Sequence, residues 1–137
     1  MTKWIAVAAV AGLALTGCGR GMDAERIEKQ LSYQVENLLD DVDATPAQRG
    51  RAEELKKQIL TDLNPLIAQS AGVRTELFTQ LMAPAPDKAK MHGAIDAQFD
   101  SMRALSHKLA DATVEFLQLL TPEQRAKVNK RLERRIQ

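Results

Sequence analysis

The most reactive side chain in this sequence is that of Cys18, the chain's only cysteine. A single cysteine cannot form an internal disulfide. Leu15, Thr16 and Gly17 precede it directly. An aliphatic residue, a small residue and a glycine in front of a cysteine form the lipobox pattern, in which the thiol accepts a diacylglycerol. The sequence therefore predicts lipidation of Cys18, and an ordinary secretory leader that happens to contain a cysteine is the alternative.

The segment before Cys18 is typical of an export signal. Lys3 gives it a positive start, and an apolar run from Ile5 to Leu15 follows. This run is shorter than the roughly 20 residues that a membrane-spanning helix needs, but it suits a signal peptide. We predict a signal peptide over residues 1–17, an acylated cysteine and short tether over 18–22, and one domain over 23–137. Gly19 favours the outer over the inner membrane, with the domain on the periplasmic side.

Two histidine–aspartate pairs are the only candidates for a metal site. His92 with Asp96 and His107 with Asp111 are each four residues apart, a spacing that places both side chains on one helix face. The two histidines would lie about 22 Å apart on one straight helix. They cannot share an ion within a chain, so a divalent metal would require two half-sites brought together in a dimer. No other cofactor is expected.

Catalysis is not expected. No Ser, His and Asp residues form an evident nucleophilic set, and the sequence has no glycine-rich phosphate loop.

The elements that would position these residues are helical. Apolar residues recur at spacings of three and four in each of four segments, which is the helical period. In order along the chain the stripes contain Ile27, Leu31, Val35, Leu38 and Val42; Leu55, Ile59, Leu63, Leu66, Ser70, Val73, Leu77 and Leu81; Ile95, Phe99, Met102, Ser106, Leu109, Thr113, Phe116 and Leu120; and Val128, Leu132 and Ile136, where Ser70, Ser106 and Thr113 are polar interruptions.

Prolines mark where the helices end. The sequence Ala83-Pro84-Ala85-Pro86 must form a turn, because proline cannot continue a helix. We therefore predict helices over about residues 46–82 and 87–119, joined as a long hairpin, with a kink at Pro65. So thin a hairpin leaves apolar surface uncovered. The side chains expected to remain exposed, and so to bind other proteins, are Leu66, Ile67, Phe78 and Met82.

A short motif occurs twice. Residues 45–49 read TPAQR and residues 121–125 read TPEQR. Threonine suits the N-cap, proline the first helical position, and glutamine the third, from which it can bond back to the cap. The motif thus predicts two capped helix starts at Thr45, Pro46 and Gln48 and at Thr121, Pro122 and Gln124, and two good caps alone would explain it.

The second copy, read from Leu120, resembles the LTxxQ motif of the Spy/CpxP-like periplasmic stress proteins, part of a superfamily that includes heavy-metal resistance proteins. The first copy departs from it, with Ala44 where leucine is expected. The resemblance covers about residues 23–136. It implies an all-α fold of four hooked helices, usually an antiparallel dimer with a curved face. It also implies roles as ATP-independent chaperones, inhibitors of sensor kinases or metal-binding resistance proteins.

Charge is uneven along the chain. The full sequence has 19 Lys and Arg against 18 Asp and Glu, a balance that argues against nucleic-acid binding. Acidic residues dominate 23–43, whereas basic residues dominate 122–137. The two segments are either solvated helix faces, ends that attract each other within a chain or across a dimer, or, for the basic end, a contact with anionic lipid or an acidic client.

Two functions from different classes remain. The first is a lipid-anchored protein that holds unfolded envelope proteins without nucleotide, which requires exposed apolar residues rimmed by charge. The second is a metal- or stress-sensing regulator that contacts a membrane sensor protein, which the short tether and the two His–Asp pairs favour. A purely structural envelope lipoprotein is a third reading.

Overall fold

The computed structural model describes residues 24–136. The predicted signal peptide, Cys18 and the tether lie outside these described residues. Four helices account for most of the described part: α2 (Ala24–Asp41), α3 (Pro46–Met82), α4 (Lys88–Gln118) and α5 (Pro122–Ile136). No strand occurs between residues 24 and 136. The predicted all-α class with four helices is confirmed, while the dimer stays a prediction.

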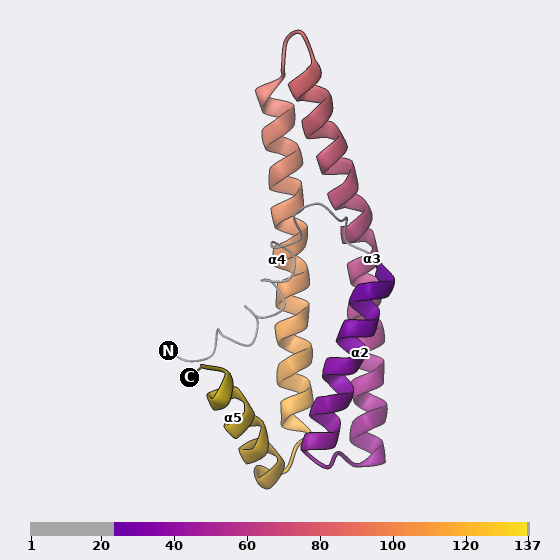
Figure 1. The fold of residues 1–137 in the computed structure, drawn as a ribbon, viewed down its shortest axis with the longest axis vertical. Helices are drawn as coiled ribbons and strands as arrows, with labels where there is room; N and C mark the ends of the chain where they lie inside the picture. Colours follow the sequence, from indigo (N-terminus) through magenta and orange to yellow (C-terminus); the bar gives the residue numbers. More distant parts are fainter. Residues whose placement is uncertain (1–23, 137) are drawn as a thin grey trace.

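The helices are arranged as a hairpin with a hook at one end. Figure 1 shows α3 and α4 side by side and antiparallel, with the connecting turn at the top. Helix α2 lies along the lower half of α3, and α5 turns away from the lower end of α4. We call the end that holds α2 and α5 the foot, and the turn at the other end the tip, which comprises residues 81–90.

Local sequence explains the ends of α3 and α4. Helix α3 stops at Met82 because Ala83 is extended, as the residue before a proline prefers to be. Helix α4 starts after Asp87, whose carboxylate accepts hydrogen bonds from the backbone N–H groups of Ala89 (2.9 Å) and Lys90 (3.2 Å). The predicted helix boundaries agree with the structure to within one residue.

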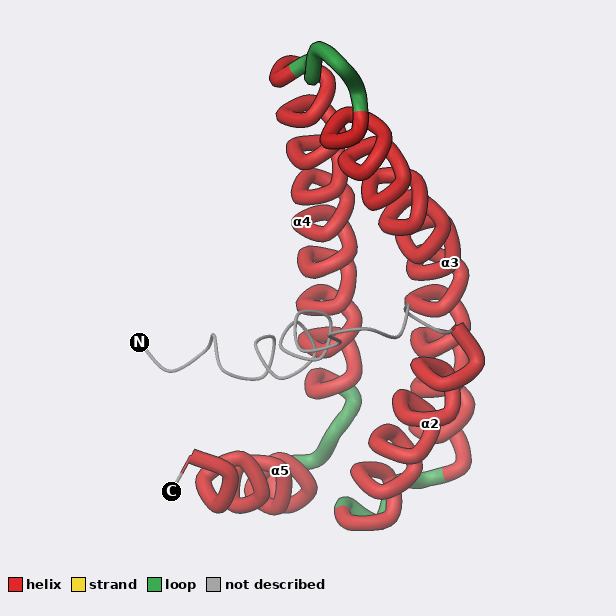
Figure 2. The backbone as a smooth tube through the Cα atoms, turned by 45° about the horizontal axis from the view of Figure 1, so that its top comes forward, coloured by secondary structure: helices red, strands yellow, loops and turns green. Residues whose placement is uncertain are grey.

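Helix α3 contains Pro65 near its middle. Proline lacks the N–H that would bond to the preceding turn, and its ring crowds that turn. Figure 2 shows that α3 curves along its length while α4 is straighter. The bend expected at Asn64-Pro65 therefore has a counterpart in the curvature of this helix.

The buried apolar core lies at the foot. Its residues come from all four helices and their connections, so that burial there fastens α2 and α5 to the hairpin. The buried members are Leu39, Val42, Ala52, Leu55, Phe116, Leu120 and Val128. Each large apolar side chain removed from water contributes about 1.5–3 kcal/mol, so most of the packing stabilisation is concentrated at this end.

The upper half of the hairpin is packed with more polar groups. Gln98 Nε2 donates to Ser70 Oγ across the two helices (2.6 Å), and Ser70 Oγ donates to the Leu66 carbonyl within α3 (2.9 Å). The polar interruption at Ser106 is satisfied in the same way, through the Met102 carbonyl (2.8 Å). The upper half therefore holds together with less apolar burial than the foot.

Four residues of the predicted apolar stripes are exposed, and two of them, Leu132 and Ile136, lie on α5. Leu81 and Phe99 were expected in the interior, but both are exposed. In each case the preceding glutamine takes the inward position: Gln80 is buried and Gln98 bonds to Ser70. A step of one residue turns a helical side chain by about 100°, which directs the apolar neighbour to the solvent.

Candidate functional site

Both copies of the repeated motif form capping boxes. The backbone N–H of Gln48 donates to Thr45 Oγ1 (3.2 Å), and Gln48 Oε1 accepts from the Thr45 N–H (2.9 Å). Gln124 and Thr121 make the same two bonds at the same distances. These reciprocal bonds satisfy amides that a helix start leaves free. The capping geometry predicted from the sequence is confirmed.

The two motif glutamines also bond to each other. Gln48 Nε2 donates to Gln124 Oε1 (2.9 Å), and Gln124 Nε2 donates to Gln48 Oε1 (3.0 Å). Each side chain is only 8% exposed. The pair thus joins two helix starts that lie 76 residues apart in the sequence.

The remaining hydrogen-bonding capacity of this pair is used on the adjoining turns. Gln48 Nε2 also donates to the carbonyl of Leu119, and Gln124 Nε2 to that of Asp43, at 2.8 and 3.4 Å. Every polar atom of the two side chains therefore has a partner, as buried polar groups require. We call this arrangement the glutamine clasp. The repetition of the motif indicates that the two glutamines have the same local role, but nothing in the sequence indicates that they contact each other.

The acidic and basic ends of the domain meet beside the clasp. Lys127 pairs with Asp43, and Arg131 pairs with Asp41. Arg131 also donates to the Asn37 carbonyl (3.3 Å). The two ion pairs agree with the reading in which the ends attract each other within one chain, while a contact of the basic end with lipid or an acidic client stays a prediction.

Asp43 has an unusual backbone and a shifted acidity. Its φ of 51° lies in the left-handed region, where aspartate and asparagine are tolerated better than most residues. The hydrogen bond from Lys127 and the charge of that lysine hold the pKa of Asp43 below its usual value. The carboxylate at this turn is thus stabilised in its charged form.

The residues proposed for binding other proteins differ in their exposure. Leu66 is buried at 7% exposure, so the expectation that it remains exposed is wrong. The reason is its place on the same helical stripe as the core residue Leu55. Ile67 is half-buried, whereas Phe78 and Met82 are 63% and 85% exposed.

A line of residues on α3 connects the region covered by α2 with the uncovered region above it. Lys56 Nζ donates to Ser32 Oγ of α2 (3.2 Å), so this side of α3 faces α2. Ile67 and then Phe78 follow at intervals of three helical turns and lie on the same side. Because α2 begins at Ala24, it does not reach them. The side of α3 that α2 covers at the foot is therefore open near the tip.

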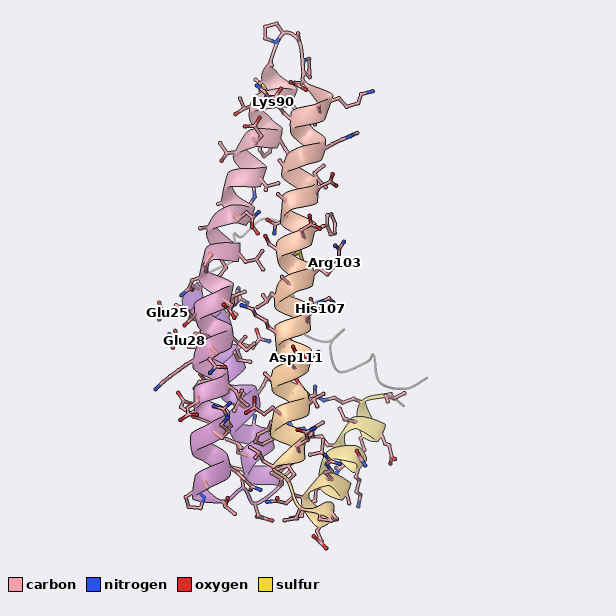
Figure 3. The ribbon with its side chains drawn as sticks, turned by 180° about the vertical axis from the view of Figure 1, so that it is seen from behind. Glu25, Glu28, Lys90, Arg103, His107 and Asp111 are labelled. Carbon is pink, nitrogen blue, oxygen red and sulfur yellow. The ribbon has the colours of Figure 1, made fainter. Side chains whose placement is uncertain are left out.

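The four candidate metal ligands do not form a site in one chain. All lie on α4 and are exposed. Figure 3 shows His107 on the side of α4 away from α3, whereas Asp111 borders a groove between α3 and α4 that also contains the Asp62–Lys108 ion pair (3.0 Å). Within residues 24–136, no three His, Cys, Asp or Glu side chains lie close enough to hold an ion.

Comparison with known proteins identifies the family. Residues 30–132 match the LTXXQ motif family. The chain belongs to this family, that of the Spy/CpxP-like periplasmic proteins. The match makes it a periplasmic protein of the envelope-stress or heavy-metal-resistance type. No curated protein and no solved structure matches significantly. None of the helices in the described part is long and apolar enough to cross a membrane.

Proposed function

We propose that this chain is a lipid-anchored holding protein that shields apolar segments of unfolded envelope proteins without nucleotide. The observation that carries the proposal is the open side of α3 beyond α2, with Phe78 exposed and Ile67 half-buried on the line that begins at Lys56. Contiguous exposed apolar patches mark contact sites in folded proteins, and the exposed Leu81 and Met82 adjoin Phe78 at helical spacings of three and four.

The distribution of packing supports this proposal. The foot is fixed by the apolar core and by the glutamine clasp. The upper hairpin presents large apolar side chains while its interior is bridged by Ser70 and Gln98. A rigid foot with a loosely packed apolar arm can adapt to clients of differing sequence, since less packing must be disrupted when the arm adjusts.

The lipid anchor at Cys18 is the second part of the proposal. Leu15-Thr16-Gly17 before the chain's only cysteine supports it, as does membership of a periplasmic family. The bacterial envelope is where such a leader is processed. An anchor would keep the holding surface near the membrane, with Gly19 favouring the outer one.

The test of holding is suppression of aggregation. A denatured client protein is diluted into buffer with and without a molar excess of the unanchored chain starting at Cys18, and light scattering is followed in the absence of nucleotide. We expect scattering to fall strongly. Unchanged scattering at molar excess would reject the holding function.

Variants locate the surface. Phe78→Ser removes an exposed apolar group and should lose most of the suppression, and adding Ile67→Ser should remove more. Val114→Ser is the matched control, because Val114 is also exposed but lies on α4. It should keep full suppression. Circular dichroism confirms that each variant is folded, and equal loss in all three would contradict this placement.

A further inference from the structure

The tip of the hairpin is unusually apolar for an exposed turn. Leu81 and Met82 are 63% and 85% exposed, and Ala83, Pro84, Ala85 and Pro86 follow them without a charge. Proline is an ordinary turn residue, but the exposed Leu81 and Met82 add two large apolar side chains that a turn does not need. An uninterrupted apolar run at the far end of a long hairpin therefore points to a non-aqueous contact.

Basic residues stand directly behind this run. Lys88 and Lys90 are exposed, and neither makes an ion pair within residues 24–136. Figure 3 shows Lys90 at the tip end of the hairpin, far from α5. The carboxylate of Asp87 is occupied with the first amides of α4. The tip thus combines exposed apolar residues with two exposed lysines next to them, a combination that suits the surface of a bilayer with anionic headgroups.

The backbone of the turn is also suited to leaving water. Pro84 and Pro86 have no N–H to desolvate. The N–H of Ala83 donates to the Gln80 carbonyl (3.2 Å), and that of Asp87 donates to Gln80 Oε1 (2.9 Å). Because an unpaired polar group is costly to remove from water, these bonds lower the cost of placing the turn among lipid headgroups.

The predicted anchor and the tip are within reach of the same surface. Lys56 contacts Ser32, and the helical runs from Lys56 to Met82 and from Ser32 back to Ala24 are about 39 and 12 Å long. Met82 therefore lies about 27 Å beyond the start of α2 along the hairpin. The chain from Cys18 to Ala24 can extend by at most about 21 Å.

We propose that the hairpin tip is a second contact with the lipid bilayer, which orients the molecule held at Cys18. This inference rests on the anchor of the proposed function. The tether reaches at most about 21 Å, whereas Met82 lies about 27 Å beyond the start of α2 along the hairpin. The hairpin must therefore lean toward the membrane for both contacts to form. Acyl chains on Cys18 supply most of the binding, so the tip decides orientation rather than affinity.

A single tryptophan can report this contact. The only tryptophan, Trp4, lies in the predicted signal peptide, so Met82→Trp gives the mature chain one probe. The acylated variant is reconstituted into vesicles of phosphatidylethanolamine and phosphatidylglycerol, with brominated lipids as quenchers. We expect the emission of the introduced indole to shift to shorter wavelength and to be strongly quenched. Val114→Trp, an exposed position of the shaft, should show neither effect.

Charge variants and a chemical anchor make the result decisive. Lys88→Gln and Lys90→Gln should each lower the equilibrium constant of the tip–lipid contact about fivefold.

Coupling Cys18 to a maleimide lipid provides the anchor even if the native chain carries no acyl group. Unquenched emission from the Met82→Trp variant on such vesicles would overturn the proposal. So would a blue shift without vesicles that grows with protein concentration, because a second copy would then cover the tip. Aggregation suppression is measured without lipid, so a failure of the holding function can be distinguished from a failure of the tip–lipid contact.

Discussion

At the residue scale, the glutamine clasp is the most specific feature of this molecule. Gln48 and Gln124 each cap their own helix and bond to each other, and each also binds the turn that precedes the other motif. Apolar side chains could fill the same space, but only a side chain with both a donor and an acceptor can perform all of these tasks. The motif is therefore a tertiary contact as well as a capping signal.

Removing one glutamine should expose this double role. We expect Gln124→Ala to lower the free energy of unfolding by about 1–3 kcal/mol, because the buried Gln48 Nε2 and the Thr121 backbone N–H both lose Gln124 Oε1 as their acceptor. Gln118→Ala, at an exposed position, is the control and should change the free energy of unfolding by less than about 0.5 kcal/mol. Urea unfolding of both variants provides the measurement. Equal effects would show that the clasp does not stabilise the fold.

At the element scale, α3 and α4 divide into a firm lower half and a looser upper half. The buried apolar residues of these helices lie mainly at the foot, and Leu66 is the exception on α3. Toward the tip, the interior is bridged by Ser70 and Gln98, and the Gln98 Oε1 atom has no partner among the described residues. We expect the amides of the upper half to exchange with solvent faster than those beside the core.

Gly72 gives a test of this division. It lies within α3 at an exposed position, and an added Cβ would meet no atom within 4 Å. Gly72→Ala should therefore stabilise the helix by about 0.5–1 kcal/mol, since alanine loses less backbone entropy on folding. Hydrogen exchange of the upper α3 amides should slow by about two- to fivefold. Unchanged exchange there would show that this half does not open locally.

At the scale of the whole molecule, the two ends of the domain meet and close the hook. Acidic groups near the end of α2 face basic groups of α5 in the Lys127–Asp43 and Arg131–Asp41 pairs, while Val128 enters the core beside them. Exposed ion pairs contribute little on their own. The buried contacts therefore provide most of the attachment of α5, and the charges favour its position beside α2.

The Asp43 contact should make stability depend on pH. Its pKa is lowered in the folded state by Lys127, so its contribution is fully present above the pKa of about 3.9 of an unfolded aspartate and is lost as the pH falls through the lower folded value. Asp43→Asn keeps a residue that tolerates the positive φ but removes the charge. We expect the variant to melt slightly below the native protein at pH 7.

The difference in melting temperature should shrink as the pH is lowered from about 4 toward about 2, because native Asp43 then becomes neutral as well. High salt at pH 7 should also reduce it, since the pair is exposed to solvent. A difference that stays constant with both pH and salt would assign the effect to the backbone of the turn instead of the ion pair.

The local features of this protein follow from its sequence alone. The ends of α3 and α4, the two capped helix starts and the hairpin could be predicted because Thr45, Pro46, Pro84 and Asp87 act within a few residues of themselves. The predicted leader and Cys18 rest on equally local patterns. Family membership also followed from a short motif, and it is shown by the match over residues 30–132.

Which side chains meet depends instead on how the helices pack. That Gln48 bonds to Gln124, that Leu66 is buried and that Phe99 is exposed depend on how each helix is rotated about its axis and aligned with its neighbours. Helical periodicity defines a stripe to within about one residue, and one residue corresponds to about 100° of rotation. The contact between the acidic and basic ends likewise required the hook, because net charge along a sequence does not specify which surfaces face each other.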